Sequence, residues 1–248
     1  MNSNFNLYGK YYDLLYADKD YFAEAKYISG CIKRELPNAT SILEFGSGTG
    51  TCGLILKGMG YDVYGVELSA QMTKRAQDKG FPCQQGDIAS FESERKFDSV
   101  ISLFHVVSYL TENSSLEKTF LNAAKCLNPN GLFIFDVWYS PAVFHQKLEN
   151  RIKRVENNEI KVMRIAEPIT RINENIVDVM YTIVVKDKIT DKWEEFTEVH
   201  SMRHFSIPEI SFLAEHTGFE VIKAEEFLTG AAPSENTWGV NFILRKNG

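Results

Sequence analysis

Acidic side chains stand at or near the ends of three successive predicted strands in the first part of the chain. Glu44 lies in the apolar run "TSILEF", Glu67 closes "YDVYGVEL", and Asp87 follows "PCQQ". Between the first two acids, "ILEFGSGTGTCG" (42–53) supplies glycines whose backbone can approach a ligand, and the following helix offers free N–H groups. A carboxylate at the end of the second strand can accept both hydroxyls of a ribose. The pattern therefore predicts a site for a nucleotide-like cofactor.

The glycines of this loop fit two different motifs. Gly48, Gly50 and Gly53 have the G-x-G-x-x-G spacing of a dinucleotide site, whereas Gly46, Gly48 and Gly50 behind Glu44 fit E-x-G-x-G-x-G. An acid beneath the loop suits a ligand with an amino group and a sulfonium, and it would repel a pyrophosphate. The second motif is favoured, and Gly53 is then expected to be a packing residue in the following helix.

The elements that must position these residues alternate between strands and helices. Apolar strands are predicted at 40–45, 61–68, 82–87, 97–104 and 131–138, with amphipathic helices between them. Strands that are apolar on both faces indicate a parallel sheet covered by helices on each side. The fold class predicted is α/β, with a Rossmann-like doubly wound sheet that is mostly parallel and has an antiparallel last strand, plus an antiparallel β insertion.

The domain prediction separates three regions. Residues 1–39 are expected to form an N-terminal helical cap over the cofactor, and residues 40–137 with 207–248 the Rossmann-like cofactor domain. Residues 138–206 read as period-two strands split by Asn-rich or Asp-rich turns, which predicts an antiparallel β insertion that covers the substrate site.

Together these segments resemble the class I S-adenosylmethionine (SAM) methyltransferases. "LEFGSGTG", "VYGVEL", "QGDI", "FDSVISLF" and "LNPNGLFIFD" occur in the order of that family, over residues 40–137 and 207–246. The resemblance implies SAM as cofactor and S-adenosylhomocysteine as product. A nicotinamide enzyme is the alternative that the glycine loop leaves open.

The resemblance also implies roles for individual residues around SAM. Glu67 would hold the ribose and Asp87 the adenine amine, and the backbone carbonyl of Leu103 would accept from the methionine amino group. An N-terminal "YYD" segment resembles the part of small-molecule methyltransferases that closes over SAM, which places Tyr12 beside the sulfonium. The remaining implied contacts come from the acid and loop beneath the methionine and from the two side chains that would sandwich the adenine: Glu44, Gly46, Ser47, Gly48, Gly50, Leu68 and Ile88.

The acceptor is expected beyond the carboxyl ends of the fourth and fifth strands, as in other α/β folds. Methyl transfer requires alignment and exclusion of water, and a hydroxyl nucleophile also needs a base. His105 and Tyr109 in "FHVVSY" are the candidate base or orienting groups, and Tyr12 is a third catalytic candidate. The predicted pocket residues are Asp136, Trp138, Tyr139 and His200. His200 and His204 share a strand face, but their spacing alone does not make a metal site, and no metal is expected.

The insertion and the aromatic N-terminus resemble enzymes that methylate nucleotide-linked sugars, several of them N-methyltransferases of amino sugars. The function predicted is therefore SAM-dependent methylation at N or O of a small polar metabolite, with a nucleotide-linked amino sugar favoured. A non-catalytic SAM-binding module, and an enzyme acting on a protein or another small molecule, remain the alternatives.

Composition excludes some partners. A formal charge of −6 and a pI near 5.5 argue against a nucleic-acid surface. The longest apolar run, 97–110, is too short and polar to span a bilayer, and the N-terminus lacks the pattern of a signal peptide. Four cysteines without metal or redox spacing are expected to be buried thiols. The protein is predicted to be soluble and cytoplasmic, and an exposed edge of the insertion could pair two chains into a homodimer.

Overall fold

The structure, a computed structural model, describes Tyr11 and residues 14–248. Its contacts divide the chain into two compact units. One comprises Asp20–Gln146 and His204–Gly248, and the other comprises Lys147–Arg203 with the described part of Met1–Lys19. In the described residues, no helix is long and apolar enough to cross a membrane.

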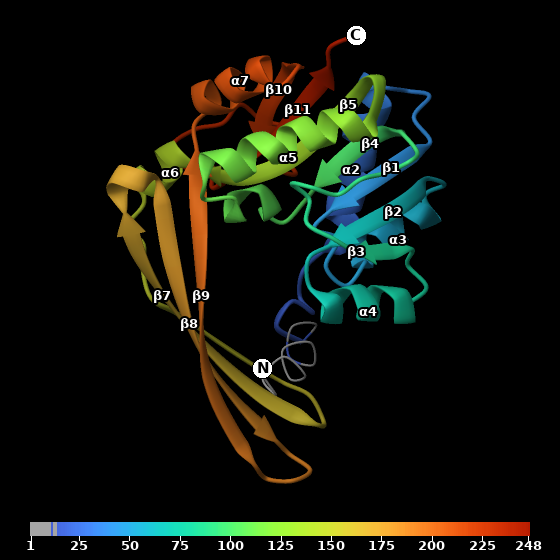
Figure 1. Cartoon of the computed structure of the whole chain (residues 1–248). Coiled ribbons are helices and arrows are strands. Elements are labelled where there is room, and N and C mark those ends of the chain that lie inside the picture. The colour runs from blue at the N-terminus through green and yellow to red at the C-terminus, as the bar shows by residue number, and fades with distance from the viewer. Residues whose placement is uncertain (1–10, 12–13) are drawn as a thin grey trace. The chain divides into compact units, whose positions relative to one another are not determined.

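The first unit is built on one twisted sheet (Figure 1). Its strands follow the order β3 (Cys83–Gln85), β2 (Asp62–Glu67), β1 (Ser41–Phe45), β4 (Phe97–Ser102), β5 (Leu127–Tyr139), β11 (Gly239–Lys246) and β10 (Phe219–Glu226). The first five are parallel, and β11 runs antiparallel to both β5 and β10. The prediction of an antiparallel last strand beside the fifth is therefore confirmed. The order reverses direction between β1 and β4, which is where ligands bind in open α/β sheets.

Helices cover both faces of this sheet. The elements are α2 (Tyr21–Glu35), α3 (Thr51–Gly58), α4 (Ala70–Asp78), η1 (Val106–Tyr109), α5 (Asn113–Cys126), α6 (Ser140–His145) and α7 (Ile207–His216). Side chains of α2, α3 and α4 share one core with Ile42, Ile134 and Ile243, whereas α5 and α7 share the other with a group of phenylalanines. Because successive residues of a strand face opposite ways, the buried strands separate these two cores. Both cores hold the carboxyl ends of the strands in fixed positions.

The second unit is an antiparallel meander. It contains β6 (Arg151–Glu156), β7 (Ile160–Arg171), η2 (Ile172–Glu174), β8 (Ile176–Asp187) and, up to Arg203, β9 (Trp193–Phe205). Each strand is paired with the next. Tyr11 and Leu15 pack on its apolar end, against residues of β7 and β8 such as Val162 and Ile183. The predicted antiparallel insertion is confirmed as an element of the fold.

The contact units and the predicted domains divide the chain at different residues. The sequence placed boundaries after 39, 137 and 206, whereas contacts separate the units after 19, 146 and 203. Helix α2 belongs to the sheet unit because Ile28 and Ile32 are fully buried in its core. The roles assigned to these regions, a cap over the cofactor and a cover for the substrate, stay predictions.

Candidate active site

The glycine loop between β1 and α3 has the backbone that its sequence predicts. Gly46, Gly48 and Gly50 have φ angles of 71°, 56° and 74°, in the left-handed region that favours glycine. A Cβ at Gly46 would lie 2.6 Å from Val106, but a Cβ at Gly48 would meet nothing within 4 Å. The loop is therefore packed tightly at its base and open above Gly48, where a ligand can approach the backbone.

Glu67 ties the end of β2 to this loop. Its Oε2 accepts a hydrogen bond from the Gly48 backbone at 2.9 Å, and its Oε1 accepts from the Ser69 backbone at 2.8 Å. These bonds fix the carboxylate beside the open side of the glycine loop. Each oxygen keeps a second lone pair for a further donor. The predicted contact with ribose hydroxyls stays a prediction that this geometry allows.

The residues expected around adenine follow β2 and β3. Leu68 is a large apolar side chain with 68% of its surface exposed, whereas Ile88 is buried. Asp87 is exposed, and its Oδ1 accepts from the Ala89 backbone at 2.9 Å, which shapes the turn after β3. An exposed leucine beside a fixed carboxylate is a surface that a planar apolar ring can cover.

Three residues implied by the resemblance face inward. Ser47 is buried, with its Oγ 3.3 Å from the Sγ of Cys83. Glu44 is 3% exposed and lies beneath α3, where its Oε2 would be 2.6 Å from a Cβ at Gly53. That Cβ would also lie 2.3 Å from the Phe81 ring, so the prediction that Gly53 is a packing residue is confirmed. Leu103 is 6% exposed directly after β4, and its carbonyl contact stays a prediction.

The turn after β4 holds His105 in a strained conformation. Phe104 and His105 have consecutive positive φ angles of 64° and 59°. For residues other than glycine such a backbone costs on the order of 1–3 kcal/mol and gathers at functional sites. The turn brings the His105 ring beside the end of β5, where Asp136 lies.

Asp136 and His105 form a pair. The His105 backbone N–H donates to both carboxylate oxygens of Asp136, at 3.3 and 3.2 Å. The Nδ1 atom lies 2.7 Å from Oδ2, although the ring is not aligned for a straight hydrogen bond. The Asp136 side chain is 1% exposed and that of His105 is 22% exposed. A partly exposed imidazole with a buried carboxylate behind it can accept a proton at its Nε2.

Aromatic side chains surround this pair. The Trp138 ring meets the His105 ring edge-on, with 6.2 Å between the ring centroids, and it meets the Trp238 ring edge-on at 5.2 Å. The Ser108 hydroxyl, fully buried, accepts from the Trp138 backbone at 3.3 Å and joins η1 to β5. Tyr109 is 49% exposed at the end of η1, and Tyr139 follows Trp138 on β5. The structure thus brings five predicted residues to neighbouring elements: His105, Tyr109, Asp136, Trp138 and Tyr139.

Two other predicted residues lie elsewhere. Tyr12 is outside the described residues. His200 belongs to the insertion, where its Nε2 lies 3.3 Å from Glu198 and its ring meets Tyr181 edge-on at 4.9 Å. Burial raises the pKa of the Tyr181 phenol, and the nearby Tyr16 raises it further. This hydroxyl therefore stays protonated at neutral pH. The substrate-pocket role of His200 stays a prediction.

Comparison with known proteins decides the family. The sequence profile of a methyltransferase domain matches residues 17–224. The chain belongs to this methyltransferase family. It is 30% identical to the dTDP-3-amino-3,4,6-trideoxy-alpha-D-glucopyranose N,N-dimethyltransferase of Streptomyces venezuelae, over 88% of this chain and 91% of that protein.

Solved structures share the fold. An S-adenosylmethionine-dependent methyltransferase from Clostridium acetobutylicum superposes with a TM-score of 0.80 at 20% identity, covering 100% of both chains. A sugar N-methyltransferase from Streptoalloteichus superposes with a TM-score of 0.83 at 22% identity, covering 100% of this chain and 94% of that one. The protein is a SAM-dependent methyltransferase with the class I fold, and the resemblance drawn from the sequence is confirmed.

The residues present fit SAM. The space above Gly48, the fixed carboxylate of Glu67 and the exposed face of Leu68 lie at the switch in strand order, where this fold binds its ligand. Bound there, SAM supplies a methyl group on a positively charged sulfur. The methyltransferase's own side chains then have to bind, orient and deprotonate the acceptor.

Sequence reasoning missed several residues of this site. Asn241 and Gly239 on β11 lie against Asp136 and His105, and Val106 packs on Gly46. The antiparallel position of the last strand was predicted, but its register was not, and only the register shows which residue opposes Asp136. The pairing of Asp136 with His105 was also missed, because Asp136 was assigned only to the pocket wall.

Proposed function

We propose that this methyltransferase transfers a methyl group from SAM to the amine of a nucleotide-linked amino sugar. The observation that carries the proposal is the 30% identity, over nearly the whole of both chains, to an enzyme that dimethylates the amine of a dTDP-linked amino sugar. The site agrees in chemistry, because an amine needs a group that accepts its proton and no strong base to create the nucleophile.

His105 is the proposed proton acceptor. The amine lone pair forms the new N–C bond while the S–C bond breaks, and its electron pair stays on sulfur. The nitrogen then carries one proton too many, which passes to Nε2 of His105. Asp136, with Oδ2 2.7 Å from Nδ1, stabilises the imidazolium that results. Trp138 and Tyr109 are proposed to orient the sugar beside this ring.

Arg164 on the insertion is proposed to bind the diphosphate of the acceptor. Its guanidinium lies 4.7 Å from the Tyr181 ring and 5.6 Å from the Tyr16 ring, and it donates to the Tyr16 hydroxyl at 3.0 Å. One N–H is used, and the planar fork has further donors that match phosphate oxygens. Arg171, by contrast, is already paired with Glu174 and Asp178. Equal KM values for a sugar and its nucleotide-linked form would argue against this role.

The test is methyl transfer with labelled SAM to a matched set of acceptors. The set contains a dTDP-linked amino sugar, the same sugar with a hydroxyl in place of the amine, the free amino sugar and a protein extract. Mass spectrometry should find one or two added methyl groups on the dTDP-linked amine alone. Transfer to the hydroxyl sugar only, or to protein only, would contradict the proposal. Tight SAM binding without any transfer would indicate a binding module.

The remaining predictions accompany this proposal. All four cysteines are buried thiols outside any disulfide, which a reducing cytoplasm permits. The edge strand β6 could pair two chains, and light scattering of the purified protein would test for a homodimer. If the insertion covers the substrate, as proposed, mutation of Arg164 or His200 should raise the KM for the acceptor and leave SAM affinity unchanged.

A further inference from the structure

Three polar side chains form a row across β5, β11 and β10. Asn241 is the ladder partner of Asp136 on one side and of Glu225 on the other. Directly opposed residues of antiparallel strands project from the same face, with Cβ atoms about 4.5–5.5 Å apart. The exposed fractions are 1% for Asp136, 0% for Asn241 and 1% for Glu225. The row therefore places one amide between two carboxylates in the protein interior.

The Asn241 side chain is unsatisfied in the described part of the chain. Neither its Nδ2 nor its Oδ1 has a hydrogen-bond partner there. Leaving a buried amide unpaired destabilises a fold, and asparagine is also disfavoured in strands. A valine would fill this position without that cost. The amide is thus not explained by packing, and one of the two carboxylates is its natural partner.

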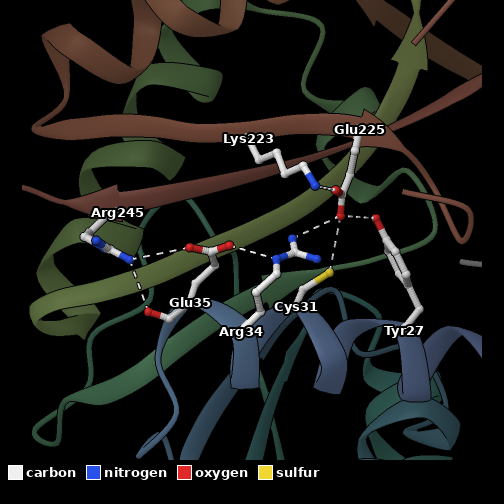
Figure 2. Close-up of polar contacts among 7 residues, drawn as sticks. All are labelled: Tyr27, Cys31, Arg34, Glu35, Lys223, Glu225 and Arg245. Atoms are coloured by element: carbon white, nitrogen blue, oxygen red, sulfur yellow. Dashed lines mark hydrogen bonds and ion pairs between the residues drawn. The ribbon is translucent and has the colours of Figure 1, made fainter. Parts of the chain in front are cut away.

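Glu225 already has a cation beside each oxygen. Its Oε1 accepts from the Tyr27 hydroxyl at 2.8 Å and from Arg34 at 3.3 Å, and its Oε2 forms an ion pair with the Lys223 ammonium at 2.6 Å, although the two groups are not aligned for a hydrogen bond. Figure 2 shows these groups converging on the carboxylate from α2 and from β10 itself. The charge of Glu225 is compensated on both oxygens.

Asp136 is short of donors. A carboxylate offers about four acceptor positions. The donors to Asp136 in the described chain all come from His105, by two long backbone contacts and a misaligned Nδ1. Strand β11 borders the pair directly, because a Cβ at Gly239 would lie 3.5 Å from Cε1 of His105. Asn241 is the donor that stands opposite this carboxylate.

We propose that Asn241 is a positioning residue for the His105–Asp136 pair. Its Nδ2 donates to Asp136 and fixes that carboxylate against Nδ1 of His105, so that Nε2 faces the acceptor. The proposal rests on the role proposed above for His105. Other titratable or charged groups on this face of the sheet and on α2 include Glu44, Cys83, Lys223, Glu225 and Arg245 from the strands and Tyr27, Cys31, Arg34 and Glu35 from α2.

The test compares Asn241→Val with Asn241→Thr. The two replacements have nearly the same shape and both suit a strand, but only threonine keeps a donor for Asp136. The valine variant should lower kcat about tenfold or more at unchanged KM for SAM, and its Tm should change little, because the hydrogen bond to Asp136 is lost while the unpaired Oδ1 is removed as well. The threonine variant should keep kcat within about threefold of wild type, since a neutral hydroxyl replaces the amide donor.

A second measurement needs no acceptor. The ring signals of His105, assigned by their loss in His105→Asn, are followed by NMR against pH. In the valine variant the midpoint should move about one unit to lower pH, because the carboxylate is no longer held against Nδ1 and supports the imidazolium less. The matched control is Ser99→Ala. It removes a different buried polar group, a hydroxyl without a partner in the described chain, and should change neither kcat nor the His105 midpoint.

The two arms separate failure of this inference from failure of the proposed function. If the wild-type enzyme does not methylate the amino sugar, the proposed acceptor is wrong, but the NMR titration of His105 still tests the positioning role of Asn241. An unchanged His105 midpoint in the valine variant overturns the inference. Equal loss of kcat in the valine and threonine variants also overturns it.

Discussion

Asp136 and Glu225 are two carboxylates of the same sheet with equal burial and different surroundings. Each is 1% exposed, on the same face, with only β11 between their strands. Glu225 is held by two cations, a phenol and a thiol (Figure 2), whereas Asp136 has His105 beside it, at the end of a strained turn. Burial alone therefore does not distinguish structure from chemistry. The distinguishing feature is whether the partners are permanent charges or a group that can exchange a proton.

His105→Asn should have the largest effect on kcat, because it removes the proposed proton acceptor that lies beside Asp136. Asparagine tolerates the left-handed backbone at this position, so the turn should persist. The expected loss in kcat is about 10²–10⁴-fold, the usual contribution of general acid–base catalysis. Steady-state kinetics would measure it, with thermal shift by SAM to show that cofactor binding remains.

The matched control for that variant is His216→Asn on the exposed surface of α7, where the imidazole hydrogen-bonds to the Phe212 carbonyl and lies against the Phe212 ring of its own helix. It should leave kcat and Tm at wild-type values. A His105→Asn enzyme that kept more than half of its kcat would contradict the assignment of the base.

Asp136→Asn should come next, with kcat lower by on the order of 10²-fold through loss of orientation and charge behind the ring. The substitution is nearly isosteric, and Tm should change little, since the carboxylate has no permanent cation to lose. A loss of several degrees in Tm with unchanged kcat would show instead that Asp136 resembles Glu225 and is structural. Glu225→Gln, which should change Tm and not kcat, is the reciprocal control.

Most of the sheet unit could be predicted from sequence because its signals are local. The strand β1, the glycine loop and Glu67 follow one another within 42–67, so periodicity and turn residues suffice to place them. The glycines with positive φ are the ones that the motif requires. For the same reason the backbone of the glycine loop could be predicted in advance, whereas the contacts of its residues with SAM stay predictions.

The acceptor side could not be predicted in the same way, because it depends on register and on a non-local turn. Asp136 and Asn241 are about a hundred residues apart, and a shift of one residue in β11 would turn Asn241 to the other face. Phe104 and His105 have positive φ angles although neither is a glycine, so the sequence does not indicate this turn. Sequence therefore found His105 and Asp136 as candidates but not as a pair.

Glu225→Gln should act on stability and not on catalysis. Removing one partner of a fully buried pair costs about 3–5 kcal/mol. Here Arg34 and Lys223 are each 43% exposed and can turn to water, so we expect a smaller loss in the free energy of unfolding, about 2 kcal/mol. Urea unfolding would measure it, and kcat of the folded variant should match wild type.

The contribution of Glu225 to the stability of the fold should depend on pH, and its direction follows from the pKa shift. Burial acts to raise the pKa of Glu225, but the bonds from Lys223, Tyr27 and Arg34 outweigh it and hold the pKa below its usual value. A carboxyl group with a lowered folded pKa stabilises the fold above its unfolded pKa of about 4.3. The stability difference between wild type and Glu225→Gln should therefore be full at pH 6. It should shrink as the pH falls through the folded pKa, and a difference that grew on acidification would contradict the assignment.

Tyr27→Phe should have the smallest effect. Burial, together with Cys31 and Glu225, raises the pKa of the Tyr27 phenol, so its hydroxyl remains a donor to Glu225 across the pH range of folding. Phenylalanine keeps the edge-on contact of the ring with Phe227 and removes only that donor. With Lys223 and Arg34 still beside Glu225, the loss should be about 1 kcal/mol, measured by urea unfolding at pH 6. A loss as large as that of Glu225→Gln would mean that the phenol, rather than the cations, holds this carboxylate in place. The contrast with Asp136 would then rest on hydrogen bonding instead of permanent charge.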